Sequence, residues 1–237
     1  MKEIKILHLF PKLLSLYGEY GNVAVLRRAL ADAGWTVTVD RYETGALDLD
    51  GYAFIYIGAG TEDNLLEAVK RLMIYKDAVR SSVEKGQLWL ATGNAMTLFG
   101  RSVTRCETVT EALGCFPYIT TIHDSKRYLG DVLTAEGFGG EFVGFINTSS
   151  VYEGITAPLL QLRLGGKLGN TKRDGADGIQ EKNFYGTELI GPVLVKNPHF
   201  LQYICRELTG EEITLPTDSN AQKAYDVALA ELKKRVE

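Results

Sequence analysis

One stretch constrains the fold of this chain more than any other: Gln87-Leu-Trp-Leu-Ala-Thr-Gly-Asn-Ala-Met-Thr-Leu-Phe-Gly100. The apolar run Leu88–Ala91 predicts a buried strand, the turn Thr92–Asn94 follows it, and a short helix is expected from Ala95. A strand that turns sharply into a helix presents its turn residue at the carboxyl end of a sheet, where open α/β folds place their chemistry. Thr92 therefore becomes the centre of the candidate site.

Strands and helices alternate around this stretch and predict a mostly parallel sheet with helices on both faces. Apolar runs predict strands at Ile4–Leu9, Trp35–Val39 and Ala53–Ile57. Helical spacing predicts one helix with Asn22 as its N-cap and a long helical stretch, capped by Thr61 or Asp63, that Gly86 ends.

The pattern changes after about Gly114, where alternation of polar and apolar residues replaces helical spacing. Strands are expected at Tyr128–Leu133, Phe142–Ile146 and Leu160–Leu164. Two helices follow. One begins at the cap Asn197-Pro198, and the other begins near Asp218 with one apolar face: Ala221, Tyr225, Ala228, Leu229, Leu232. We therefore expect residues 1–237 to form one α/β domain with an added antiparallel portion.

Composition excludes several classes of protein. The net charge is -4, and no basic run is longer than Lys233–Arg235, which argues against nucleic acid as the main partner. No apolar stretch reaches membrane-spanning length, and the immediate start of a strand predicts no signal peptide. Cys106, Cys115 and Cys205 form no close pair and no metal-binding spacing, so we expect a reducing cytoplasm and neither a metal nor a cofactor.

Several blocks of sequence occur in a specific order and spacing. They are Leu7–Asn22, Ile57–Asp63, Ala91–Gly100, Leu168–Asn170, Asp177–Gly178 and Gly186–Pro198. Each block is weak alone, but the ordered set resembles the CobQ-like class I glutamine amidotransferases of the GatD type, from Ile4 to about Leu208. The resemblance implies a class I glutamine-amidotransferase-like fold and a role in bacterial peptidoglycan synthesis.

The resemblance also implies a chemistry. In that family a cysteine on the elbow attacks the glutamine side-chain amide, a distant histidine activates it, and backbone N–H groups hold the oxyanion. The ammonia passes to a synthetase partner, which for the GatD type is a MurT-like Mur ligase that amidates a cell-wall precursor.

This sequence departs from the family where that chemistry takes place. Thr92 stands at the position of the cysteine, Ile190 at that of the histidine, and Met96 at that of the elbow glutamine. Ile146 and Thr148 change a nearby segment of the family pattern. The losses cluster at the site while the scaffold blocks persist, which indicates a degenerate active site.

Alternatives remain for several residues. Thr92 could still be a nucleophile if His123 or Glu188 served as its base, although Glu188 may face away, or it could simply fill the site. Cys106 and Cys115 are expected to be buried structural cysteines. We expect His8 to be satisfied in the core and His199 to be exposed.

Candidate substrate-binding residues lie in two turns: Gly58, Gly60, Gly93 and Asn94. The turn Gly58–Gly60 could present N–H groups to an anion or could serve only a tight turn. The loop Leu13–Tyr17 could be core packing or part of a subunit interface.

The preferred hypothesis is a non-catalytic GatD homologue that acts as a structural or regulatory partner of a MurT-like Mur ligase. Two alternatives stay open: an active amidotransferase that uses non-standard residues, and a stand-alone protein that binds a small molecule in the old glutamine pocket. The interface is expected around the mouth of the old site, in Leu13–Asn22, Gly58–Asp63 and Tyr185–Pro192, with Leu14 and Leu189 as test positions if they are exposed.

Overall fold

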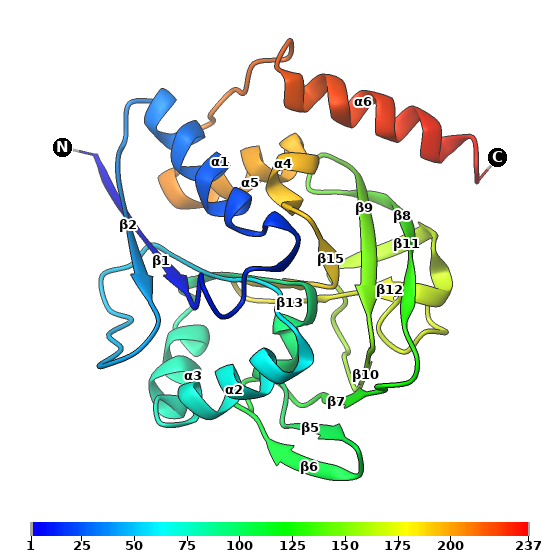
Figure 1. Cartoon of the computed structure of the whole chain (residues 1–237). Helices are drawn as coiled ribbons and strands as arrows, with labels where there is room; N and C mark the ends of the chain where they lie inside the picture. Colours follow the sequence, from blue (N-terminus) through cyan, green and yellow to red (C-terminus); the bar gives the residue numbers. More distant parts are fainter. Residues whose placement is uncertain (1, 237) are drawn as a thin grey trace.

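The computed structural model describes residues 2–236 and contains a six-stranded sheet at its centre (Figure 1). The strand order is β13 (Ile179–Glu181), β14 (Phe184–Thr187), β4 (Leu88–Thr92), β3 (Phe54–Ile57), β1 (Glu3–Leu9) and β2 (Thr36–Tyr42). All neighbouring pairs are parallel except β13 with β14. The predicted parallel sheet is therefore confirmed, and β4 lies inside it between β3 and β14.

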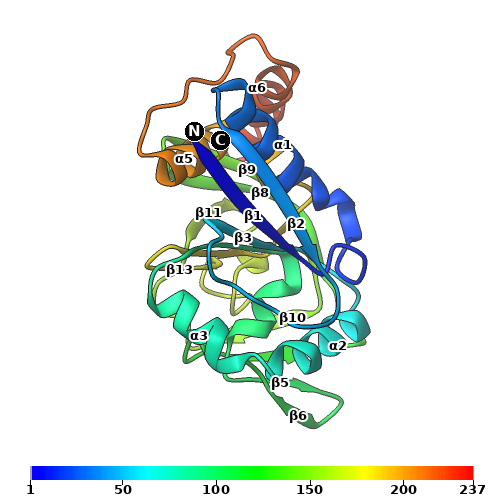
Figure 2. The same cartoon turned by 90° about the vertical axis from the view of Figure 1, so that its left-hand side faces the viewer.

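Helices cover both faces of this sheet, as Figures 1 and 2 show. One face carries α1 (Tyr20–Asp32), α4 (Val193–Lys196) and α5 (Pro198–Thr209), and the other carries α2 (Glu62–Met73) and α3 (Lys76–Glu84). Successive side chains of β3 point into two separate hydrophobic clusters, Phe54 and Tyr56 into one and Ile55 and Ile57 into the other. Because both faces are covered, the central strands are apolar throughout.

Two further sheets follow: the first is mixed, because β5 and β7 pair in parallel, and the second is the predicted antiparallel portion. The first has the order β10 (Ser150–Glu153), β7 (Ile119–Ile122), β5 (Ser102–Arg105), β6 (Thr108–Glu111). The second has the order β12 (Ala176–Asp177), β11 (Leu160–Leu164), β8 (Tyr128–Gly137), β9 (Gly140–Thr148), β15 (Leu189–Ile190). Strand β15 follows β14 almost directly, so the chain passes from the central sheet into the second sheet beside the elbow.

The last helix, α6 (Asn220–Lys233), begins after Ser219, whose side chain accepts a hydrogen bond from the Gln222 N–H. It lies across the ends of β8 and β9 (Figure 1). Across residues 220–233, all of which the structure describes, no side chain is fully buried. The residues of its predicted apolar face are partly buried, because the helix rests on the surface of the second sheet.

Several predicted helix boundaries need correction. Helix α1 begins at Tyr20, so Asn22 lies within its first turn and is not its N-cap. The long helical stretch is broken near Tyr75 into α2 and α3, although Thr61 does cap α2 through the Asn64 N–H. Helix α5 does begin at Pro198 with Asn197 in the N-cap position, as predicted, but the Asn197 amide bonds to Val143 on β9 and to Val193 and makes no side-chain cap.

Within residues 2–236, no helix combines the length and the apolar character that crossing a membrane requires.

Candidate functional site

The elbow has the predicted geometry. Strand β4 ends at Thr92, and Gly93 takes a φ of +59°, in the left-handed region that favours glycine. The segment that follows is the 3-10 helix η2 (Gly93–Phe99), in place of the short α-helix expected from Ala95. A Cβ at Gly93 would lie 2.7 Å from the Cβ of Ala59, so the elbow is packed closely against the turn after β3.

A buried carboxyl group, Glu19, occupies the space beside Thr92. The hydroxyl of Thr92 donates to Oε2 of Glu19, and the Tyr56 hydroxyl donates to the same oxygen at 2.8 Å. The other oxygen accepts the Gly191 N–H at 2.8 Å. Glu19 and Thr92 are both 0% exposed. The nucleophile position is therefore closed from solvent, and its hydroxyl is bonded inside the protein.

Three further contacts hold this network in place. The amide of Asn22 donates to the Tyr56 hydroxyl at 2.9 Å and accepts the Leu194 N–H at 2.9 Å. Tyr56 and Thr92 lie on the neighbouring strands β3 and β4, with their hydroxyl oxygens 2.8 Å apart. The network thus ties α1 and α4 to the carboxyl ends of two central strands.

Burial raises the pKa of Glu19 above its ordinary value, and this effect outweighs the hydrogen bonds and the Lys196 charge, which lower it. This direction of shift does not remove Glu19 as a base, since a raised pKa makes a carboxylate a stronger proton acceptor. A threonine hydroxyl needs an adjacent base to act as a nucleophile.

Ile190 lies directly over the elbow. If Gly93 carried a Cβ atom, the Cγ2 of Ile190 would lie 3.1 Å from it. Ile190 belongs to β15 and is almost fully buried. The Lys196 ammonium donates to the Ile190 carbonyl at 3.2 Å. An aliphatic side chain at this position excludes water and offers no group that could move a proton.

Only a small cavity remains beside the elbow, with a volume of about 60 Å³. Gly60, Asn94, Thr148, Ile190 and Arg127 are among the residues that line it. Pockets that hold a small molecule usually measure roughly 300–1,000 Å³. The cavity at the elbow is therefore well below the usual size of a small-molecule pocket.

The four candidate substrate-binding residues lie together at the elbow but use their polar groups internally. Asn94 accepts the Gly60 N–H at 3.1 Å and donates to the Gly60 carbonyl at 2.8 Å. Added Cβ atoms at Gly58 and Gly93 would meet Glu19 and Ala59 at 3.0 and 2.7 Å. These contacts favour the tight-turn interpretation of Gly58–Gly60 over an anion site.

Comparison with known proteins agrees with the geometry. The Staphylococcus aureus (strain N315) lipid II isoglutaminyl synthase (glutamine-hydrolyzing) subunit GatD is 29% identical over 206 residues, covering 86% of this chain and 84% of the relative. The subunit of the same name from Streptococcus pneumoniae (strain ATCC BAA-255 / R6) is 25% identical over 227 residues, covering 90% and 85%. A scan against known protein families gives no match.

Solved structures show the same fold. A glutamine amidotransferase crystal structure matches with a TM-score of 0.56 and 19% identity, over 86% of this chain and 99% of that one. A glutamine amidotransferase from Thermotoga maritima matches with a TM-score of 0.52 and 11% identity, over 98% and 97%. The chain is similar to GatD subunits over most of its length and has the fold of glutamine amidotransferases. The predicted resemblance and fold class are both confirmed.

A second buried polar network lies behind the elbow of this GatD-like chain. Glu188 is ion-paired with Lys172 at 2.6 Å, and Asp177 accepts the Thr187 hydroxyl at 2.5 Å and the Glu188 N–H at 3.1 Å. Burial raises the pKa of Glu188 to about 7 despite the Lys172 charge. Glu188 pairs with Lys172, whereas the Thr92 hydroxyl bonds to Glu19.

The histidines supply no base for Thr92. His8 is buried against Tyr56, and His199 is half-buried against Phe142; desolvation lowers the pKa of each to about 4. Each has an Nε2 with no hydrogen-bond partner within the described residues, so the expectations of a satisfied His8 and an exposed His199 are wrong. His123 is exposed and lies before β8.

No cysteine replaces the missing thiol in residues 2–236. Cys106 is exposed, contrary to expectation, and donates to Asp124, which raises its thiol pKa. Burial raises the pKa of Cys115 and of Cys205 to about 12. A thiol with a raised pKa carries little thiolate at neutral pH and is a poor nucleophile.

Sequence reasoning missed Glu19 and Tyr56 as members of the site. Glu19 lies in the block Leu7–Asn22, and Tyr56 lies in an apolar strand. A carboxylate directly before a helix and a tyrosine near the end of a buried strand were the available signals. Glu19 and Tyr56 contact each other at the site only because the fold brings residue 19 close to residue 92.

Proposed function

We propose that this chain is a catalytically degenerate homologue of the GatD glutaminase subunit, and that it serves as a structural or regulatory partner of a MurT-like Mur ligase in the cytoplasm. The observation that carries the proposal is the buried hydrogen bond from Thr92 to Glu19 beneath Ile190. We also propose that residues 1–237 form a single domain, because β15 continues directly from the central sheet into the second sheet.

The closed site supports loss of glutaminase chemistry on two grounds. A nucleophile must be reached by its substrate, and Thr92 has no exposed surface. It must also lose its proton to a base, and Ile190, an aliphatic residue that cannot take a proton, stands at the position of the family's histidine. The core strands remain well packed although the residues expected for catalysis are replaced. This contrast supports the proposal that the fold is retained for another role.

The contact between Thr92 and Glu19 also favours one competing function, an active amidotransferase with a threonine nucleophile and a carboxylate base. That function requires the site to open, since Ile190 and the turn Gly58–Gly60 now cover it. A cavity of about 60 Å³ weighs against a stand-alone binder that uses the old pocket.

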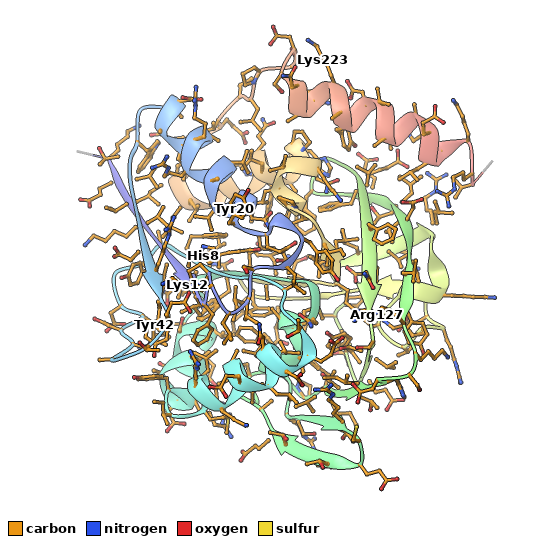
Figure 3. The ribbon with its side chains drawn as sticks, viewed as in Figure 1. His8, Lys12, Tyr20, Tyr42, Arg127 and Lys223 are labelled. Atoms are coloured by element: carbon orange, nitrogen blue, oxygen red, sulfur yellow. The ribbon has the colours of Figure 1, made fainter. Side chains whose placement is uncertain are left out.

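The expected interface around the mouth of the site needs new test positions. Leu14 and Leu189 are both 1% exposed, so a charge at either position would damage the core. Tyr20, at the start of α1, is 66% exposed and belongs to the same predicted surface (Figure 3). Exposed aromatic side chains are common anchors of protein interfaces.

The test is to co-express the tagged chain with the Mur ligase of its native host and to measure both co-purification and ammonia release from glutamine. We expect a complex and no ammonia above background. Tyr20→Glu should weaken the complex at least tenfold, because it places a charge in the interface. Val227→Glu, on α6 and also 66% exposed, is the matched control and should leave the complex intact.

Ammonia release that Thr92→Ala abolishes would favour the active amidotransferase and overturn the degenerate site. A ligase that ignores the wild-type chain would overturn the partner proposal, and one that binds both Glu variants normally would overturn the placement of the interface.

A further inference from the structure

We propose that this chain binds a small phosphorylated molecule, through its diphosphate group, in a basic cavity separate from the old glutamine site. The cavity measures about 640 Å³ and lies between the start of β8 and the segment 167–173. Its basic lining residues are His123, Lys126, Arg127, Lys167, Lys172 and Arg173. We refer to it as the basic cavity; the proposal does not depend on the function proposed above.

The charges of the basic cavity are poorly balanced by the protein itself. Arg127 pairs with Glu62 at 2.9 Å, and Lys172 pairs with Glu188. Lys126, Lys167 and Arg173 make no ion pair within residues 2–236. Glu153 is the one carboxylate of the lining. This local excess of positive charge occurs in a chain whose net charge is -4, so overall composition does not explain it.

Part of the cavity is already organised. The side chain of Lys172 is 6% exposed, and its ammonium is held by Glu188 and by the Leu168 carbonyl at 3.2 Å. The ammonium groups of Lys126 and Lys172 lie 4.7 and 5.3 Å from the centre of the Tyr128 ring. Such cation–π contacts restrict two long side chains that would otherwise be mobile. A site with fixed charges loses less entropy when an anion binds.

The chemistry of the lining favours a diphosphate. A phosphate group offers several acceptor oxygens for Lys and Arg donors, and two linked phosphates can engage more of the three unpaired cations than one carboxylate can. Leu129, which is exposed, and Val151 add an apolar wall that suits an organic substituent. The volume of the basic cavity lies in the range of small-ligand pockets. Its charges converge on one cavity, whereas the charges of a nucleic-acid site extend along a surface.

Arg127 connects this cavity to the elbow. It lines both cavities and stands at the start of β8 (Figure 3). Its guanidinium donates to Glu62 and to Asn147, so it is already occupied on the elbow side. The residues to test are therefore Lys167 and Arg173, which are exposed and take no part in the elbow network.

The experiment is isothermal titration calorimetry of the full chain with inorganic pyrophosphate, uridine diphosphate and orthophosphate in 0.15 M KCl. We expect one site for each diphosphate and at least tenfold weaker binding of orthophosphate. Lys167→Ala and Arg173→Ala should each weaken pyrophosphate binding about tenfold, since each removes one charge-assisted contact. Lys223→Ala, an exposed lysine on α6 far from Arg127 in Figure 3, is the matched control and should bind like the wild type.

Circular dichroism and urea midpoints will show that the variants fold, which is expected because both side chains are exposed. Pyrophosphate affinity that is equal in Lys167→Ala and Lys223→Ala would overturn the site. Orthophosphate affinity equal to that of pyrophosphate would overturn the diphosphate assignment. Tighter, Lys167-dependent binding of single-stranded RNA would replace the small molecule with a nucleic acid.

Discussion

The elbow and the basic cavity are two polar regions built in opposite ways. At the elbow, Glu19, Thr92 and Tyr56 are buried and satisfy one another. In the basic cavity, Lys126, Lys167 and Arg173 face open space without ion-pair partners within the described residues. Buried polar groups that bond to each other stabilise the fold. Like charges that converge on a cavity destabilise the fold slightly, and they are available to a ligand.

The largest effect expected from this difference is on stability at the elbow. Glu19→Ala leaves the Thr92 and Tyr56 hydroxyls and the Gly191 N–H without their shared acceptor, so it should lower the free energy of unfolding by roughly 3–5 kcal/mol. Urea unfolding followed by circular dichroism measures this. Glu67→Ala, which removes an exposed partner of Arg71, should cost under about 1 kcal/mol. Equal losses in the two variants would contradict a self-satisfied elbow.

The next effect concerns pH. Burial raises the pKa of Glu188 from 4.5 to about 7, so its folded form binds a proton more tightly than its unfolded form does. The stability from this group is present below pH 4.5 and is lost as the pH rises towards 7, a loss of the order of 3 kcal/mol at most. His8 and His199, with a lowered pKa, act in the opposite direction between pH 4 and 6.5.

The test of this effect is therefore a difference between two proteins. The double variant Lys172→Met, Glu188→Gln removes both charges of the pair while keeping most of their volume. In urea unfolding from pH 4.5 to 7, the stability of the double variant minus that of the wild type should increase with pH, because only the wild type loses the contribution of Glu188. Parallel curves would mean that Glu188 remains ionised throughout this range.

The smallest expected effect concerns Ile190, the aliphatic side chain that packs over the elbow. Ile190→Val removes one buried methyl group above Gly93 and should lower the free energy of unfolding by about 1 kcal/mol. Ile74→Val removes the same group from a side chain that is 77% exposed and should change stability by less than about 0.5 kcal/mol. Thermal or urea unfolding of both variants would show whether Ile190 is packed as tightly as the structure shows.

Local periodicity was sufficient to predict four strands of the central sheet, β1 to β4, but not β13 and β14. The apolar run Leu88–Ala91 and the turn at Gly93 specify a buried strand and an elbow through interactions between near neighbours. Cap-like residues were less informative, because Asn22 and Asn197 use their amides to bond to distant backbone groups. The same side chains suit either purpose, and the tertiary structure decides between them.

The contents of the site could not be predicted in the same way. Glu19 lies 73 residues from Thr92, and its role follows from the packing of α1 against the carboxyl ends of β3 and β4. The burial of Leu14 and Leu189 likewise depends on how loops fold back on the elbow. The basic cavity combines side chains near residues 126 and 170, which no local spacing connects.

Helix α6 is held to the second sheet in part by polar contacts. Its contacts include the Tyr225 hydroxyl bond to the Glu141 carbonyl, the Lys233–Glu141 ion pair, and the ion pair of the following residue Arg235 with Asp131. Beneath it runs a groove of about 880 Å³, lined in part by Val143 and Ala228. Ion pairs at a surface are weakened by salt. The helix should therefore lift from the sheet as a unit while the core stays folded, so its amide hydrogens exchange with solvent sooner than those of β4, and sooner still at high ionic strength.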